Sequence, residues 1–311
     1  MGGYFYGWYL KCQSEGQTLA VIPAVHRTGR RRTASIQIIT EDGAWIVPFR
    51  ADAFRRVKGD IYIGKNRFGG RGIRLSIHTP QVSAEGRLSF GALSPLKYDI
   101  MGPFALVPFL ECRHSVMSMR HLVQGTMYIN GQRYTFRDAW GYWEGDSGRS
   151  FPKEYVWSQC SFSGGALMLS VADIPIAGFH FNGVICVVQW KGREYRLATY
   201  LGARAVQIQD GTVRIVQGDM ELEAWLLERA DRPLKAPAIG DMVRTIHESA
   251  ACRIFYRFRK GKRTLFAFET DRASFEYEYS DKVQRDHKYN KERIRVRKRG
   301  EENFEQKGEW E

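Results

Sequence analysis

The sequence has few of the residues that build metal sites and disulfide frameworks. Its five cysteines are an odd number, scattered without a Cys-x-x-Cys spacing, which excludes a zinc ribbon and a disulfide-stapled fold. The seven histidines form no His-x-His pair and no histidine–carboxylate pair at helical spacing, so we expect no metal site. No glycine-rich phosphate loop ends in Lys-Ser or Lys-Thr. We therefore expect neither a metal ion nor a cofactor.

Long hydrophobic runs are also missing. The stretch 102–110, GPFALVPFL, is among the longest, and it contains two prolines and is much shorter than the roughly 18 residues that span a bilayer. The N-terminus, MGGYFYGWYLK, lacks the basic region, apolar core and small-residue cleavage site of an export signal. These absences predict a cytoplasmic protein with no transmembrane span.

What the sequence has in quantity is strand-forming segments. They are short, β-branched or aromatic, and partly alternating between apolar and polar residues; they lie at 34–40, 60–64, 73–77, 126–130, 183–190 and 212–217. Gly and Asn turn pairs of the kind that joins hairpin strands separate them. No segment sustains a helical period, although residues 220–229 fit either a helix or a strand. We therefore predict an all-β fold.

The two halves of the sequence repeat each other. At an offset of 138, nine identities fall between residues 62 and 97 and their counterparts, where about two are expected by chance. They include the run 95–97, Pro-Leu-Lys, which matches 233–235. An offset of 148 aligns Cys12 and Leu19 with Cys160 and Leu167. The alternative is coincidence between two β-rich stretches, but the matches stay in order along both halves, which favours a tandem duplication.

Each half has the length of one antiparallel barrel or sandwich. We predict an N-terminal domain over residues 1–138, a connector over 139–153, a C-terminal domain over 154–281 and a charged tail over 282–311. The 282–299 part of the tail has nine Lys or Arg against two acidic residues. Such runs bind the phosphates of nucleic acids or anionic membrane lipids, or are simply solvated, disordered termini. Both alternatives stay open, so peripheral membrane contact is part of the prediction.

The connector and the strand after it contain the densest chemistry. Residues 141–160 read GYWEGDSGRSFPKEYVWSQC. The four residues 145–148, Gly-Asp-Ser-Gly, match the nucleophile segment of chymotrypsin-like serine proteases. However, Arg149 and Ser150 replace the Gly-Pro that follows it there, and no Ala-Ala-His-Cys segment comes earlier. A catalytic triad is recognised by geometry, so this match does not indicate a protease.

The same stretch resembles the tocopherol cyclase family. The matching positions are Glu144, Gly148, Ser150, Phe151, Pro152, Trp157, Gln159 and Cys160, together with 7–9, Gly-Trp-Tyr, and the segment 95–103. The resemblance covers most of residues 3–280. It implies two lipocalin-like β-domains and closure of a chromanol ring on a prenylated quinol, or hydration of an isoprenoid alkene as in the similar carotenoid 1,2-hydratases. The sequence departs from the pattern of the plant enzymes of this family at three positions: Gly145, where Lys is usual; Asp146, where Asn is usual; and Ser147, where Trp is usual.

Such reactions begin with protonation of an alkene, which needs a protonated acid in a dry pocket. Glu144 and Asp146 are two residues apart and point the same way on an extended segment, so a shared proton would raise the pKa of one of them. Aromatic rings nearby could line the pocket and stabilise the cation: Trp140, Tyr142, Trp143 and Trp157. The alternative is that both acids face solvent and pair with Arg149.

Residues 111–121 form a second group of polar candidates. Alternation places Cys112 and His114 on one face of a strand, and Arg113 and His121 on the other. These faces line a ligand cavity or carry surface ion pairs, and both alternatives remain open. We expect the connector and the barrel interiors to form one apolar site.

The function we predict is an acid-catalysed cyclase or hydratase, with a hydrophobic small molecule as its partner. The proton donor is Glu144 or Asp146. Ligand contacts are expected from Trp8, Asp99, Arg113, His114, Tyr142, Arg149, Trp157 and Gln159. The alternative function is a non-enzymatic carrier of a lipid or isoprenoid, which needs the pocket but not the acid.

Overall fold

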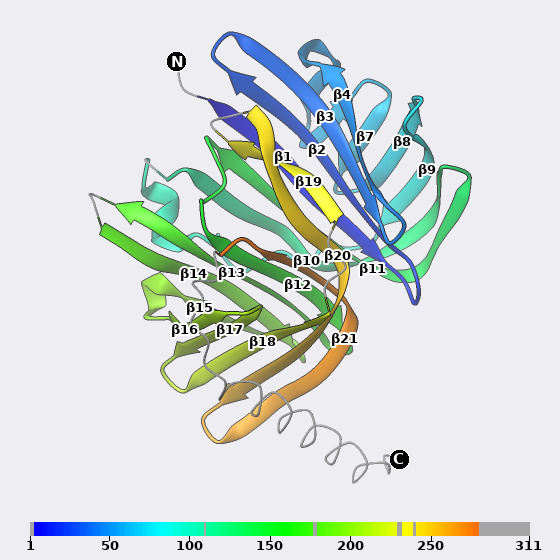
Figure 1. Ribbon diagram of the computed structural model, residues 1–311. Coiled ribbons are helices and arrows are strands. Elements are labelled where there is room, and N and C mark those ends of the chain that lie inside the picture. Colours follow the sequence, from blue (N-terminus) through cyan, green and yellow to red (C-terminus); the bar gives the residue numbers. More distant parts are fainter. Residues whose placement is uncertain (1–2, 109, 177–178, 229–231, 239–240, 280–311) are drawn as a thin grey trace. The chain divides into compact units, whose positions relative to one another are not determined.

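A computed structural model describes residues 3–108, 110–176, 179–228, 232–238 and 241–279 (Figure 1). Apart from three short 3-10 turns, its regular structure is all strand, as predicted. The first antiparallel sheet consists of β1 (Tyr4–Gln13), β2 (Thr18–Thr28), β3 (Arg31–Thr40), β4 (Ala44–Arg50), β5 (Phe54–Val57), β6 (Asp60–Ile63), β7 (Asn66–Gly69), β8 (Gly72–His78), β9 (Ser83–Phe90), β10 (Cys112–Ile129) and β11 (Gln132–Gly148).

The second sheet repeats this plan. It consists of β12 (Tyr155–Phe162), β13 (Gly165–Ile176), β14 (Phe179–Trp190), β15 (Arg193–Ala198), β16 (Arg204–Gln209), β17 (Thr212–Gln217), β18 (Met220–Glu228), β19 (Arg232–Ala238), β20 (Asp241–Lys260) and β21 (Arg263–Tyr277). The first strand of each sheet pairs with the last one, β1 with β11 and β12 with β21. This pairing curls each meander into a nearly closed barrel.

The strand registers confirm the tandem duplication. Cys12 lies opposite Leu19 in the first sheet, and their counterparts Cys160 and Leu167 lie opposite each other in the second. In the same way, Ile77 faces Ala84, and Ile215 faces Leu222, seven residues further along in both cases. One match has a different origin, because residues 95–97 form a loop whereas 233–235 lie in β19.

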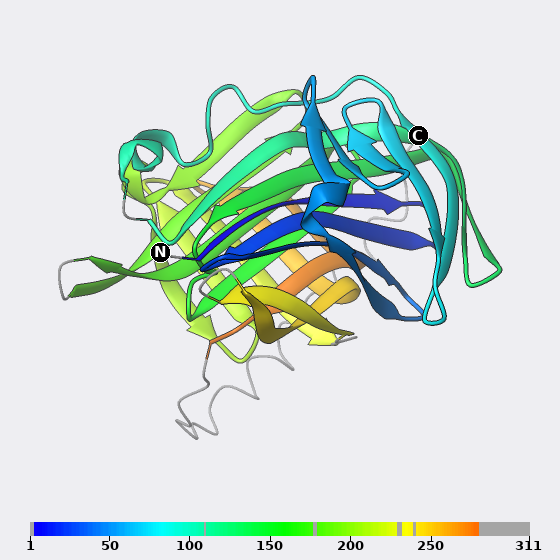
Figure 2. The ribbon, with the colours of Figure 1, turned by 90° about the horizontal axis from the view of Figure 1, so that it is seen from above.

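Each sheet has its own core, and a third core lies between the sheets. Along β1, Trp8 and Leu10 point into the first barrel, whereas Tyr9 points out of it and packs against residues of the second sheet. Along β12, Val156 points into the second barrel and Trp157 points back towards Tyr9. Figures 1 and 2 show the two sheets packed against each other. Both faces of these strands are therefore largely buried.

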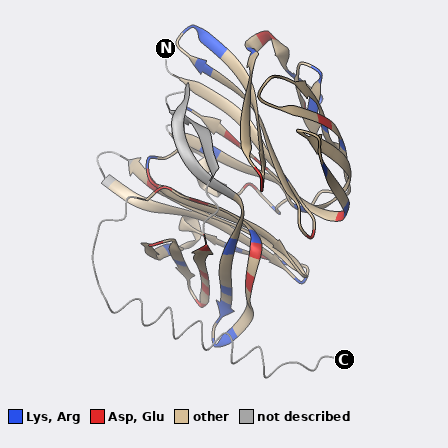
Figure 3. Ribbon diagram, turned by 45° about the vertical axis from the view of Figure 1, so that its right-hand side comes forward, with Lys and Arg blue, Asp and Glu red and all other residues tan. Residues whose placement is uncertain are grey.

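Charged residues of the second sheet lie along its strands as well as at their ends (Figure 3). On the second sheet, arginines and glutamates of neighbouring strands pair with each other, for example Arg253 with Glu228 and Arg259 with Glu221. No helix among the described residues is long and apolar enough to cross a membrane. The predicted tail, residues 282–311, lies outside the described residues, so its role stays a prediction.

Candidate active site

A cavity of about 220 Å³ lies between the two sheets. Most of its wall consists of apolar and aromatic side chains on the outward faces of the strands, and a few acidic and imidazole groups are set among them. An apolar cavity with few converging polar groups is typical of a small-molecule site. This location differs from our prediction that the barrel interiors contribute to the site, because large apolar side chains fill both interiors.

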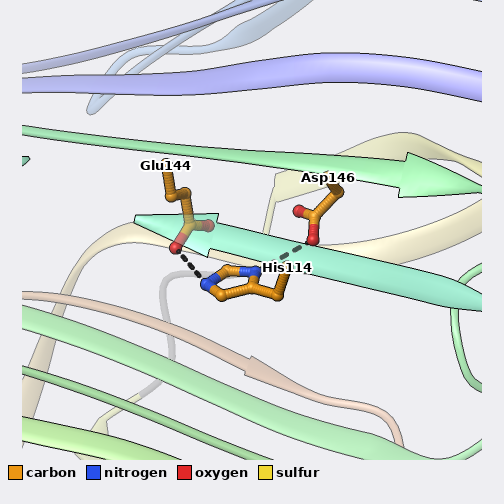
Figure 4. A group of neighbouring side chains, drawn as sticks. All are labelled: His114, Glu144 and Asp146. Carbon is orange, nitrogen blue, oxygen red and sulfur yellow. Dashed lines mark hydrogen bonds and ion pairs between the residues drawn. The ribbon is translucent and has the colours of Figure 1, made fainter. Parts of the chain in front are cut away.

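Strand β11 brings the two predicted acids into this cavity. Alternation along the strand places Glu144 and Asp146 on the cavity side, and Trp143 on the side of the first core. The neighbouring strand β10 adds His114, which lies directly opposite Asp146 in the register. His114 Nδ1 lies 2.9 Å from Asp146 Oδ1, and His114 Nε2 lies 3.1 Å from Glu144 Oε2. Figure 4 shows the imidazole between the two carboxylates.

Glu144 is deeply buried and tightly held. Its side chain is 6% exposed, and its Oε2 accepts hydrogen bonds from the Tyr142 hydroxyl at 2.5 Å and from Trp157 Nε1 at 3.2 Å. Burial raises the pKa of Glu144, and the neighbouring His114 opposes that rise. A carboxyl group in such surroundings keeps a proton more readily than one in water, which is the property that a general acid needs.

His114 holds a second proton next to this acid. Burial acts to lower the pKa of His114, but the charges of Glu144 and Asp146 outweigh it and raise that pKa well above its usual value. The two neighbouring acids therefore favour the protonated form of the imidazole. The Nε2 contact with Glu144 is close enough for an ion pair but is not aligned as a hydrogen bond. The three side chains together can supply a proton to the cavity and replace it afterwards.

The same three residues are also the one group among the described residues whose donor atoms could hold a metal ion. Their ligand atoms all lie within 4.8 Å of one another. However, each ring nitrogen of His114 already faces a carboxylate oxygen. A metal would need one of these ion pairs to break, since a ligating imidazole nitrogen must give up its proton. The acid–imidazole–acid arrangement accounts for the cluster without a metal.

The structure distributes the other predicted ligand contacts unevenly. Trp8 and Trp157 line the cavity. Tyr142 and Gln159 are buried but do not line it; the Tyr142 hydroxyl donates to Glu144. Asp99 is exposed, and its Oδ1 accepts a hydrogen bond from the backbone of Met101.

The two predicted arginines are also away from the cavity. Arg113 is exposed and donates to the Val107 carbonyl, and Arg149 is exposed as well. The alternative in which the acids face solvent and pair with Arg149 is therefore not what the fold produces, because Glu144 and Asp146 pair with His114. Of the four aromatic residues expected around the acids, Trp157 lines the cavity, whereas Trp143 belongs to the first core and Trp140 stacks on Arg120.

We predicted that His121 shares a strand face with Arg113, and irregularities in β10 explain why the alternation of faces does not continue beyond Val116. The register shifts between Val116 and Ser118 and again between Ser118 and His121. As a result, His121 turns inwards, where its ring packs 4.3 Å from that of Phe90 and its Nδ1 contacts the Ser118 hydroxyl. A β-bulge of this kind leaves no clear trace in the hydrophobic pattern.

Our sequence analysis missed Glu276, Tyr155 and the apolar segment around Phe104, all of which line the cavity. Phe104, Val107 and Leu110 belong to a stretch that is too short to span a membrane, and they form part of the cavity wall instead. The duplication was a usable signal for Glu276, as described below.

Gly145, a departure from the plant pattern, has a packing reason. It lies opposite Trp8 in the register, and a Cβ atom here would come within 2.6 Å of the Trp8 ring. The glycine lets Trp8 pack edge-on against Trp143, with ring centroids 4.9 Å apart. A lysine at this position therefore requires a different arrangement of Trp8.

Comparisons with known proteins agree with this architecture. The fold is that of tandem lipocalin-like β-proteins. Residues 79–199 match the family described as tocopherol cyclase-like, which confirms the resemblance seen in the sequence. The matched stretch contains His114, Glu144 and Trp157. No curated protein sequence matches the chain.

Two solved structures illustrate the similarity of fold. The crystal structure of CghA with Sch210972 is 9% identical in sequence, with a TM-score of 0.57, and the alignment covers 90% of this chain and 89% of that one. Kievitone hydratase from Nectria haematococca is 8% identical, with a TM-score of 0.52 and a coverage of 89% of each chain. At these identities the comparisons show the fold alone.

Proposed function

We propose that the protein is an acid catalyst that protonates an isoprenoid alkene in the cavity between its sheets and then closes a ring or adds water. The observation that carries this proposal is the burial of Glu144 in an apolar cavity, with its carboxyl group next to the His114 imidazole. A buried acid and a dry pocket are the two requirements for forming a carbocation from an alkene.

Each residue has a defined part in this step. Glu144 gives its proton to the less substituted alkene carbon, which leaves a cation on the other carbon and a carboxylate on Glu144. The rings of Tyr9 and Trp157 line the cavity at this point, 5.3 Å apart, and their π faces stabilise positive charge. A hydroxyl of the ligand, or a water, then attacks the cation and loses its proton, which finally passes to solvent. His114 returns a proton to Glu144 and regains one from solvent, and Asp146 keeps the imidazole oriented.

The family match supports the cyclase or hydratase class, and the name of kievitone hydratase is consistent with it. The chain departs from the plant pattern next to Glu144, so we propose a prenylated quinol or a related isoprenoid rather than one particular substrate. The apolar walls favour a hydrophobic ligand that carries a few polar groups.

The test is incubation with prenylated hydroquinones in heavy water. We expect a cyclic or hydrated product with one carbon-bound deuterium, because the proton on Glu144 exchanges with solvent before it is transferred. Failure to form any such product would remove the catalytic proposal. A carrier would instead bind the hydroquinone and release it unchanged, and Glu144→Gln and Asp146→Asn would leave that binding intact.

A further inference from the structure

The duplication places a second glutamate at the position equivalent to Glu144. In the first sheet Tyr9 lies opposite Glu144, and in the second sheet Trp157 lies opposite Glu276. The offset of 148 that aligns Cys12 with Cys160 also aligns Tyr9 with Trp157. Glu276 is thus the counterpart of Glu144 on the last strand of the repeated sheet.

The packing of the two sheets brings these equivalent positions together. The rings of Tyr9 and Trp157 are in contact, with centroids 5.3 Å apart. Equivalent residues come into contact when two copies of a repeated unit pack against each other through the same face, as two subunits do in a symmetric dimer interface. The two glutamates consequently line one cavity instead of two separate ones.

The surroundings of the two carboxylates differ. Glu144 lies next to the His114 imidazole, whose Nε2 is 3.1 Å from its Oε2. Glu276 is 8% exposed, and its Oε2 accepts a hydrogen bond from the Tyr155 hydroxyl at 2.5 Å. Tyr155 also lines the cavity. Most of the cavity wall is apolar, so a ligand that reaches the Glu276 carboxylate gains most by presenting a hydroxyl group to it.

We propose that Glu276 binds the hydroxyl group of the ligand and accepts its proton while the ring closes; this inference rests on the function proposed above. Glu144 gives its proton to an alkene carbon, the hydroxyl oxygen forms a bond to the cationic carbon, and the O–H proton passes to the Glu276 carboxylate. After product release, solvent takes this proton from Glu276, and Glu144 regains one through His114. The substrate is then a prenylated phenol or alcohol with a free hydroxyl, and not a plain isoprenoid hydrocarbon.

A binding experiment tests this site without any turnover. The probes are a geranylated hydroquinone and its dimethyl ether, and the signal is quenching of tryptophan fluorescence. We expect the wild-type protein to bind the free hydroquinone about tenfold more tightly than the ether, as for one hydrogen bond to a charged group. Glu276→Gln should reduce that preference several-fold, and the matched control Glu85→Gln, an exposed glutamate on β9, should keep it. Equal binding of both probes by the wild-type protein would overturn the inference.

Turnover in heavy water then separates the two acids. Glu276→Gln should still exchange deuterium into the alkene of the recovered hydroquinone, but it should close the ring about a hundredfold more slowly. Glu144→Gln should lose both exchange and closure. Ring closure by Glu276→Gln at the wild-type rate would contradict the role of Glu276. If the wild-type protein shows the binding preference but neither exchange nor closure, the proposed reaction fails and Glu276 remains a hydroxyl-binding residue. Tyr155→Phe, which keeps the Glu276 side chain, tests the same site if Glu276→Gln does not fold.

Discussion

The imidazole of His114 lies 3.1 Å from the carboxylate of Glu144 inside an apolar cavity. Thirty residues separate them in sequence, and the antiparallel pairing of β10 with β11 brings them together. Buried ion pairs add little to stability because desolvation offsets the attraction. Their position in a cavity instead points to proton transfer.

Replacement of His114 should change the pH dependence of the reaction. The rate falls on the alkaline side as Glu144 loses its proton. His114 opposes the rise in the Glu144 pKa, so His114→Gln should raise that pKa and move the alkaline limb to higher pH by about 1–3 units. The measurement is the rate of deuterium incorporation against pH, with the exposed His78→Gln as control. An alkaline limb that stays in place would show that His114 does not act on Glu144.

The glycine beside Glu144 should not tolerate the lysine that is usual in the plant pattern. A Cβ atom at Gly145 meets the Trp8 ring at 2.6 Å, and crowding of this kind costs about 1–3 kcal/mol or more. Gly145→Lys should therefore lower the melting temperature by several degrees. Gly16→Lys is the matched control, because no atom lies within 4 Å of a Cβ there. Equal melting temperatures for the two variants would contradict the packing described for Trp8.

His121 should make stability depend on pH in the mildly acidic range. Burial lowers its pKa to about 4, below the value of about 6.5 in the unfolded chain. Between these two pH values the unfolded state therefore binds more protons than the folded state. The contribution of His121 to the unfolding free energy is fully present above pH 6.5 and is lost as the pH falls towards 4. The loss amounts to about 3 kcal/mol.

Denaturant unfolding of the wild-type protein and His121→Phe over pH 4–7 measures this contribution. The two proteins should differ in the pH slope of the unfolding free energy, with the steeper fall on acidification in the wild type. Parallel slopes would indicate that His121 is accessible to protons in the folded state. The exposed His78→Phe serves as the control, since it removes a histidine without changing the core.

Local pattern was enough to predict part of this molecule. Alternation placed Glu144 and Asp146 on one face, and the repeat of Cys12 at Cys160 predicted the duplicated fold. The local sequence pattern did not reveal that His114 lies between the two acids, because this depends on the β10–β11 register and on bulges near Ser118. Nor did it place the cavity between the sheets, since that depends on how the outward face carrying Tyr9 packs on the one carrying Trp157. Such long-range packing leaves no periodic signal in either segment.

The central claim is that Glu144 transfers a proton to carbon, and locating deuterium in the product tests it most directly. With a geranylated hydroquinone in heavy water, NMR should find one deuterium at the formerly unsaturated, less substituted carbon for the wild-type protein. For Glu144→Gln, whose amide cannot donate the proton, the yield should fall by about 10²–10⁴-fold while binding persists. Two results would contradict this account. One is that Glu144→Gln forms the same labelled product at the wild-type rate, and the other is that the wild-type protein binds the hydroquinone but never incorporates deuterium into it.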